Sequence, residues 1–523
     1  MKKVLILFVA VMLALPAMSY AGSVDSRWDL TIGGMVKLDV QWANQTVSQL
    51  ATFAERDSGT WVSARASNSA VSWGAAESRL NFLVKGPDTW GAKTSAFIEG
   101  DFQRQAVYSQ DAATRSEIES YGSFGLRHAF MKFDWPTFSV VAGQTWSVPG
   151  VMPCFCLLTT SDFGVFNKGY FVPEIYGVWQ ATKTFSITGG VMAPYDGTKG
   201  VGGTPTNGLA IDQASYGGMP DFFAELNYKT DSCGKIGPWM LQFGLGGLWG
   251  QEKDLAPSST AGLTSSPASN FAYFFDKAGY DSTKVQTWMV TFKTYVPIIP
   301  EKAPGKLAHS LGFAGSGFTG QNARELFPPS PFFGGMTSYN RAPLIVGQST
   351  SAGSFQSGIQ GRADYVAPVV SGGWGQLFFY WTDTLWSGLY YGQAQIRKSQ
   401  TSSSLANGTG PGTTALQTGF QTVTATSGNN GTSAVITPTG DFVALTNAPI
   451  TTVDKQTNWV INLIYDPNPA IRLGIEYSHI MSHYPNTIAG AVATSTGVVT
   501  IPANALKNSG TLDVIHFAAQ YFF

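Results

Sequence analysis

The sequence predicts a transmembrane antiparallel β-barrel of about 16 strands, and three observations carry that prediction. A basic start precedes an apolar N-terminal run, strictly alternating apolar residues end the chain, and only 12% of the residues are charged. The usual charged share is about 25%. Mean hydropathy is +0.01, as expected when lipid-facing and lumen-facing residues alternate along each strand.

The N-terminus reads as a secretory signal peptide over residues 1–21. Lys2 and Lys3 precede the apolar run 4–15, and Ser19-Tyr20-Ala21 forms a small-x-small cleavage site. The run is too short to span a bilayer as a helix, and no later run of about 18 apolar residues occurs. No linker or shift in composition divides residues 22–523, so we expect one exported domain.

The last stretch, 512–523, is a strand with one continuous apolar face. That face carries Ile515, Phe517, Ala519, Tyr521 and Phe523, and the opposite face carries Val514, His516, Ala518, Gln520 and Phe522. A terminal aromatic residue suits a strand whose outer face meets hydrocarbon and whose end lies among lipid headgroups. The stretch resembles the C-terminal strand of Gram-negative outer-membrane β-barrels, and an amphipathic edge strand of a soluble β-sandwich is the alternative.

The first predicted strand shows the same alternation. In 28–42, an apolar face includes Leu30, Leu38 and Trp42, while Lys37 and Asp39 share the other face. In a barrel the polar face meets water in the lumen. The same period of two predicts further strands at 76–85, 92–102, 124–133, 138–146, 173–180, 184–193, 221–229, 239–250, 284–296, 306–315, 359–367, 374–383, 455–465 and 471–480.

Short and long connections alternate between these strands. Gly- and Pro-containing turns make the short ones, such as 86–91, 134–137 and 466–469. The long ones are predicted at 43–75, 103–123, 147–172, 194–219, 251–283, 316–358, 384–454 and 481–510. This asymmetry assigns the short turns and both termini to the periplasm and the long loops to the outside of the cell. The 384–454 loop is rich in Ser, Thr, Gly and Asn, and its role stays open.

Two motifs, Leu126-Arg-His-Ala-Phe130 and Ala142-Gly-Gln-Thr-Trp146, resemble those of DcaP-like porins and their relatives. The resemblance implies a 16-stranded trimeric porin in the outer membrane whose third loop, here about 147–172, folds inward as a constriction. That loop contains Asp162 and Lys168, and its middle is apolar. A loop that caps the outer mouth is the alternative. DcaP-like members often carry an N-terminal coiled coil, for which the stretch 22–28 is too short.

Inward-facing charges are the candidate pore-lining residues. The basic candidates are Lys37, Arg79, Lys93, Arg127, Lys293, Arg362 and Arg472, and the acidic ones are Asp39, Glu99, Asp101, Asp162, Asp364 and Glu476. Opposed rows of charge orient dipolar solutes and disfavour apolar ones. For each charge alone, pairing with a neighbour on the next strand is the favoured explanation, so the hypothesis is the cluster and not any one member. The sequence leaves open whether anions or cations are preferred.

Three cysteines form neither a disulfide framework nor a zinc pattern. Cys154 and Cys156 lie in the predicted third loop, where a small ring or two free thiols are both possible, although so short a ring would be strained. Cys233 lies in a predicted periplasmic connection, too distant to join them. No cofactor or metal site is predicted.

The sequence favours passive diffusion of small hydrophilic solutes over the other function classes. The net charge of −1 argues against a nucleic-acid partner. The expected partners are outer-membrane lipid and lipopolysaccharide, and the trimer is implied only by the resemblance. The five histidines stand outside any hydrolase motif, so no enzyme is predicted. A barrel that sheathes a partner, a fatty-acid channel with an N-terminal plug and a surface structural protein are the rivals.

Overall fold

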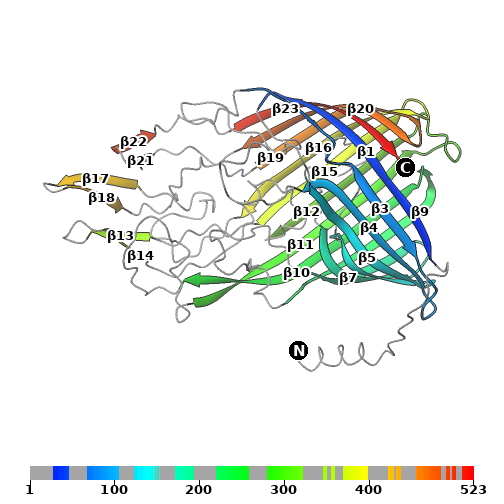
Figure 1. The fold of residues 1–523 in the computed structure, drawn as a ribbon, viewed down its shortest axis with the longest axis horizontal. Helices are drawn as coiled ribbons and strands as arrows, with labels where there is room; N and C mark the ends of the chain where they lie inside the picture. Colours follow the sequence, from blue (N-terminus) through cyan, green and yellow to red (C-terminus); the bar gives the residue numbers. More distant parts are fainter. Residues whose placement is uncertain are drawn as a thin grey trace.

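A closed antiparallel barrel of 16 strands dominates the computed structural model (Figure 1). The structure describes residues 28–45, 68–104, 123–147, 149, 152, 166, 171–193, 219–257, 280–321, 345–349, 355–359, 369–398, 422–428, 431–437, 455–483, 490–494, 497–501 and 509–523. The predicted signal peptide lies outside them. The described residues contain no helix that is long and apolar enough to cross a membrane.

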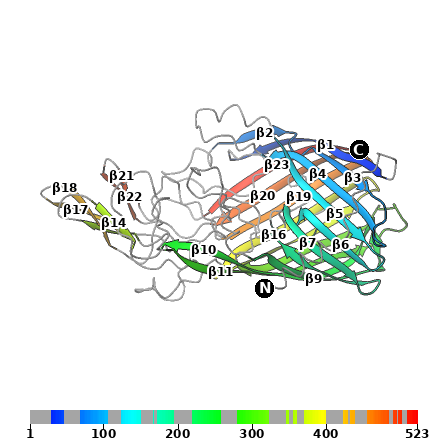
Figure 2. The same cartoon turned by 60° about the horizontal axis from the view of Figure 1, so that its bottom comes forward.

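The barrel strands follow one another around the wall in chain order. They are β1 (Asp29–Ala43), β2 (Ala70–Gly74) with β3 (Arg79–Lys85), β4 (Lys93–Arg104), β5 (Ser123–Asp134), β6 (Phe138–Trp146), β7 (Phe171–Gln180), β8 (Phe185–Met192), β9 (Asp221–Ile236), β10 (Trp239–Pro257), β11 (Tyr280–Ile299), β12 (Leu311–Gln321), β15 (Val369–Tyr380), β16 (Leu385–Lys398), β19 (Lys455–Asn468), β20 (Ile471–His483) and β23 (Ser509–Phe522). Figure 2 shows their common tilt against the long axis of the barrel.

The first and last strands close the barrel. β1 pairs with β23 from Met35–Phe522 to Ala43–Val514. The N–H of Gly34 donates to the carbonyl of Phe523 at 3.0 Å, and the N–H of Phe523 donates back at 3.1 Å. The predicted closing strand is therefore confirmed, and closure removes the unpaired edges that lipid cannot satisfy.

An exposed apolar belt covers the outer wall. Aromatic side chains gather toward the end with short connections, namely Trp28, Trp90, Trp179, Trp381, Tyr465, Tyr521 and Phe523. A second set, Trp42, Trp73, Phe102, Phe124, Phe222 and Trp249, lies toward the opposite strand ends, with aliphatic residues such as Leu245, Leu389 and Ile461 between. Two aromatic girdles around an aliphatic band are the pattern of a barrel in a bilayer.

Strand two departs from its predicted form. The sequence predicts one strand over 76–85, but β2 begins at Ala70, and residues 75–78 interrupt the pairing with β1 before β3 begins. The irregular residues turn the carboxylate of Glu77 toward Lys37 on the inner side. The predicted loop 43–75 is correspondingly shorter, since its last residues belong to the sheet.

Between residues 300 and 400 the predicted boundaries are wrong. The 306–315 prediction overlaps a connection held by local hydrogen bonds, and β12 begins only at Leu311. The 374–383 prediction misplaces β15, because Thr382 accepts the N–H of Leu385 in a turn after Tyr380. β16 occupies the start of the predicted 384–454 loop. The 359–367 prediction lies outside the described residues except at its first residue.

The short connections lie at one end of the barrel with the C-terminus, as the sequence predicts. Three two-stranded sheets lie beyond the other end (Figure 1). They are β13 (Ile345–Ser349) with β14 (Phe355–Ile359), β17 (Thr422–Gly428) with β18 (Gly431–Thr437), and β21 (Gly490–Thr494) with β22 (Gly497–Ile501).

Candidate functional site in the barrel lumen

The pairing register assigns charged side chains to the inner wall. Arg79 pairs with Asp101, and Glu476 pairs with His516. Since successive side chains alternate between faces, residues in register with an inward neighbour also face inward. Of the sequence-predicted charges, the register brings Lys37, Asp39, Arg79, Lys93, Glu99, Asp101, Arg127, Lys293, Arg472 and Glu476 to this face.

A first charge cluster lies where β1 meets the broken second strand. Lys37 is fully buried, its ammonium pairs with Glu77, and it lies 3.0 Å from the Oδ1 atom of Asp39. His516 Nε2 and Asp39 Oδ1 are hydrogen-bonded at 2.7 Å. Neither Glu77 nor His516 was a sequence candidate. The strand break that points Glu77 inward leaves no signal in the alternation of polar and apolar residues.

A second cluster surrounds Arg127 on β5. Its Nη1 donates to Asp101 at 2.5 Å and its Nε donates to Glu99 at 2.9 Å. The register of β4 and β5 shifts between Glu99 and Gly100, so Arg127 points inward beside His128 rather than to the opposite face. The guanidinium carbon also lies 4.7 Å from the ring centroid of Phe171, within the cation–π range.

A third cluster joins β9 and β11. Lys293 Nζ donates to Glu225 Oε1 at 2.6 Å, and both side chains are buried. Asn227 Nδ2 donates to the same carboxylate oxygen at 2.8 Å. The alternating pattern of 221–229 contained the signal for Glu225, since Asp221, Glu225 and Asn227 fall on one face of that strand.

Two predicted residues lie near the short-connection end. Arg472 pairs with Asp466 at 2.8 Å and lies 5.6 Å from the Trp386 ring centroid. Lys93 is exposed there at the first position of β4. Asp162, Lys168, Arg362 and Asp364 lie outside the described residues, as do Cys154 and Cys156. Cys233 is a free, exposed thiol near the end of β9.

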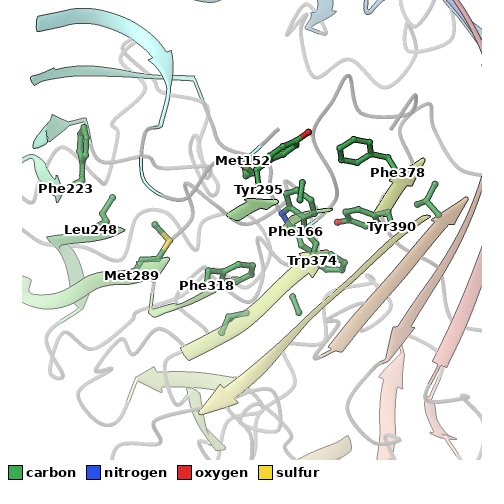
Figure 3. Close-up of a cluster of buried hydrophobic side chains, with 14 of the residues drawn as sticks. Met152, Phe166, Phe223, Leu248, Met289, Tyr295, Phe318, Trp374, Phe378 and Tyr390 are labelled. Carbon is green, nitrogen blue, oxygen red and sulfur yellow. The ribbon is translucent and has the colours of Figure 1, made fainter. Parts of the chain in front are cut away.

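Part of the inner wall is aromatic rather than charged. Tyr295 on β11, Trp374 and Phe378 on β15 and Tyr390 on β16 are all buried (Figure 3). The ring centroids of Trp374 and Tyr390 are 5.7 Å apart, and those of Tyr295 and Phe378 are 5.9 Å apart. Sequence reasoning missed this surface, because β16 carries aromatic residues on both faces.

Two residues of the connection between β6 and β7 pack against this aromatic wall. Met152 and Phe166 are each 1% exposed and belong to the same buried cluster as Tyr390. A Cβ atom built on Gly392 of β16 would lie 2.3 Å from Cδ2 of Phe166. Glycine thus leaves the space that the Phe166 ring occupies, and a connection rooted in β6 and β7 reaches a strand elsewhere on the wall.

Solved outer-membrane channels are similar to this chain in structure. The outer membrane channel DcaP of Acinetobacter baumannii is 15% identical with a TM-score of 0.53, covering 96% of this chain and 99% of that one. An anion-selective porin from Comamonas acidovorans is 10% identical with a TM-score of 0.45, covering 95% of this chain and all of that one.

OprB of Pseudomonas putida is 8% identical with a TM-score of 0.42, covering 95% of this chain and 94% of that one. No family model and no curated protein sequence matches the chain. The likeness to DcaP extends over nearly the whole of both chains and shows the fold. With its closed 16-strand wall and exposed apolar belt, the chain has the fold of the outer-membrane porins.

Proposed function

We propose that this chain is an outer-membrane porin, a water-filled channel for passive diffusion of small hydrophilic solutes and ions. The observation that carries the proposal is the combination of a closed 16-strand wall with charged side chains on its inner face. A barrel of this size encloses an aqueous channel. The outer apolar belt fits a lipid and lipopolysaccharide surrounding, and we propose a homotrimer as the assembly.

The connection 147–170 is the constriction in this proposal. The support is the contact of its Met152 and Phe166 with the aromatic wall around Tyr390. A segment anchored across the lumen narrows the path and brings solutes close to the charges on β4, β5 and β7. Selectivity in such a channel comes from the narrowest point and its charges.

The Arg127 and Lys37 clusters supply fixed charge beside that path. Two carboxylates contact each base, and these ion pairs hold the side chains in place. Guanidinium and carboxylate groups so placed create a transverse field that orients dipolar solutes. We propose no catalytic role for these groups.

A barrel that sheathes a partner, or a surface structural protein, is the second candidate. The three small sheets beyond the barrel end offer a surface for contacts outside the membrane. The buried Phe166 contact argues against a threaded partner, because it places a side chain of the chain itself inside the barrel.

Single-channel recording in a planar bilayer tests the proposal. Refolded protein should insert in groups of three equal conductance steps, and liposome swelling should show uptake of small sugars and exclusion of large ones. A folded, inserted barrel that never conducts contradicts the porin proposal and favours the sheath. Conducting steps that arrive singly would contradict only the trimer.

A further inference from the structure

Buried lumen-facing charges of the described residues are mostly acidic. Three bases, Lys37, Arg127 and Lys293, face seven acids, Asp39, Glu77, Asp101, Glu174, Asp221, Glu225 and Glu476. The register also places the more exposed Arg79, Lys93, Lys229, Arg472 and Glu99 on the inner face, which gives seven bases and eight acids. The described wall therefore carries net negative charge.

The buried bases already contact carboxylates. Asp39 and Glu77 hold Lys37, Glu99 and Asp101 hold Arg127, and Glu225 holds Lys293. A base neutralised by one or two carboxylates attracts a passing anion weakly, because the field of the pair decays faster than that of a single charge. These clusters thus give the wall few sites for an anion.

Glu174 on β7 is the acid on which the inference rests. It is 4% exposed, and neither carboxylate oxygen has a hydrogen-bond partner among the described residues. The register sets it between Gly143 of β6 and Met192 of β8. Neither neighbour brings a cation or a side-chain donor, so no described group of the protein neutralises this carboxylate.

Gly143 keeps the neighbouring position small. Its φ of 140° disfavours any side chain, and a Cβ atom there would lie 2.2 Å from the carbonyl oxygen of Ala129. Glu174 also lies three residues beyond the start of β7, where the connection carrying Phe166 returns to the wall. The carboxylate therefore lies at the root of the proposed constriction.

An ionised carboxylate buried without a partner is costly, and either a proton or a cation from solution relieves that cost. In an alkaline potassium solution the cation takes that role. We propose that Glu174 is a cation-binding residue of the lumen and that the channel prefers cations, from K⁺ to solutes carrying an ammonium or guanidinium group, over anions. The proposal rests on the proposed channel function and gives that channel its solute class.

The test is the reversal potential of single channels across a KCl gradient at about pH 9, where carboxyl groups are ionised. Wild type should be cation-selective, and Glu174→Gln should lower the K⁺/Cl⁻ permeability ratio by about fivefold, the Boltzmann factor of one unit charge in water at about 4 Å. Asp88→Asn removes the same charge from an exposed turn and should leave the ratio unchanged. Glu174→Asp should retain most of the preference.

Anion selectivity in wild type overturns the proposal, as does a Glu174→Gln channel with wild-type selectivity. If Glu174→Gln fails to fold, the wild-type channel still decides. A cation site predicts that conductance saturates with K⁺ concentration and that added guanidinium, which competes for the site, lowers the K⁺ current. An unsaturated conductance insensitive to guanidinium is then the overturning result. Absence of any conductance contradicts the porin proposal itself and is distinguished in the first recording.

Discussion

Replacing Phe166 by alanine should release the connection between β6 and β7 from the aromatic wall. The ring is 1% exposed and lies against Gly392, so its removal leaves a cavity among Trp374, Tyr390 and their neighbours. Truncating a buried Phe to Ala costs about 3–5 kcal/mol. At about 1.4 kcal/mol per tenfold, the ratio of anchored to released connection falls on the order of 10²-fold or more.

Single-channel recordings report this change directly. Phe166→Ala should show frequent transitions to a larger conductance, since a released segment no longer narrows the lumen. Gly392→Ala should act in the same direction, because its methyl group would occupy the position of the Phe166 ring. Phe243→Ala, on the lipid-facing side of β10 and 40% exposed, is the matched control and should leave the conductance as in wild type.

The reasoning is refuted if Phe166→Ala and Phe243→Ala give the same conductance and the same open-channel noise as wild type. Equal thermal unfolding of the two variants in detergent would point the same way, because the buried ring would then contribute no packing free energy.

Four further outcomes are expected. Lys37→Met leaves two buried carboxylates without their cation and should lower the free energy of unfolding, measured by urea titration in detergent micelles, by about 3–5 kcal/mol; an unchanged midpoint would contradict the buried pairing. Arg127→Gln should raise the K⁺/Cl⁻ permeability ratio in the reversal-potential assay, and an unchanged ratio would place the guanidinium outside the ion path. The N–H of Ala308 lowers the pKa of Asp383, in the exposed turn after β15, below its ordinary 3.8. The stability that Asp383 contributes is therefore present above that value and lost as pH falls through the lowered pKa, so thermal melting of wild type and Asp383→Asn should differ at about pH 6 and coincide at about pH 2. Cys233, in a background whose other two cysteines are serine, should react with an impermeant maleimide only after the outer membrane is permeabilised, and labelling of intact cells would reverse the assigned orientation.

The barrel itself was predictable from the sequence because of one geometric rule. A strand's side chains alternate with a period of two, and a wall with lipid on one side and water on the other must sort them by polarity. The stretch 512–523 and the strand predicted at 138–146 therefore appear where the alternation placed them. The assignment of Lys37, Asp39 and Glu476 to the inner face follows from the same rule.

The alternation of polar and apolar residues does not locate a strand whose two faces carry similar residues. β16 has Trp386 and Tyr390 on the inner face and Leu389 and Tyr391 on the outer face, so it was hidden in a predicted loop. The start of β12 was misplaced because the turn before it includes the apolar residues Leu307 and Ala308. In such segments the hydrogen-bonding partner, not the local pattern, decides where a strand begins.

Only the tertiary structure decided which residues of the lumen meet. Pairing Lys37 with Glu77 requires a break in the second strand, and the inward direction of Arg127 requires a shift in register between β4 and β5. The contact of Phe166 with Gly392 depends on closure of the wall. The absence of a hydrogen-bond partner for Glu174 among the described residues depends on the register of β7 against β6 and β8. The local sequence pattern determines which face of a strand each side chain lies on. Distances across the lumen depend on the register and closure of all the strands together.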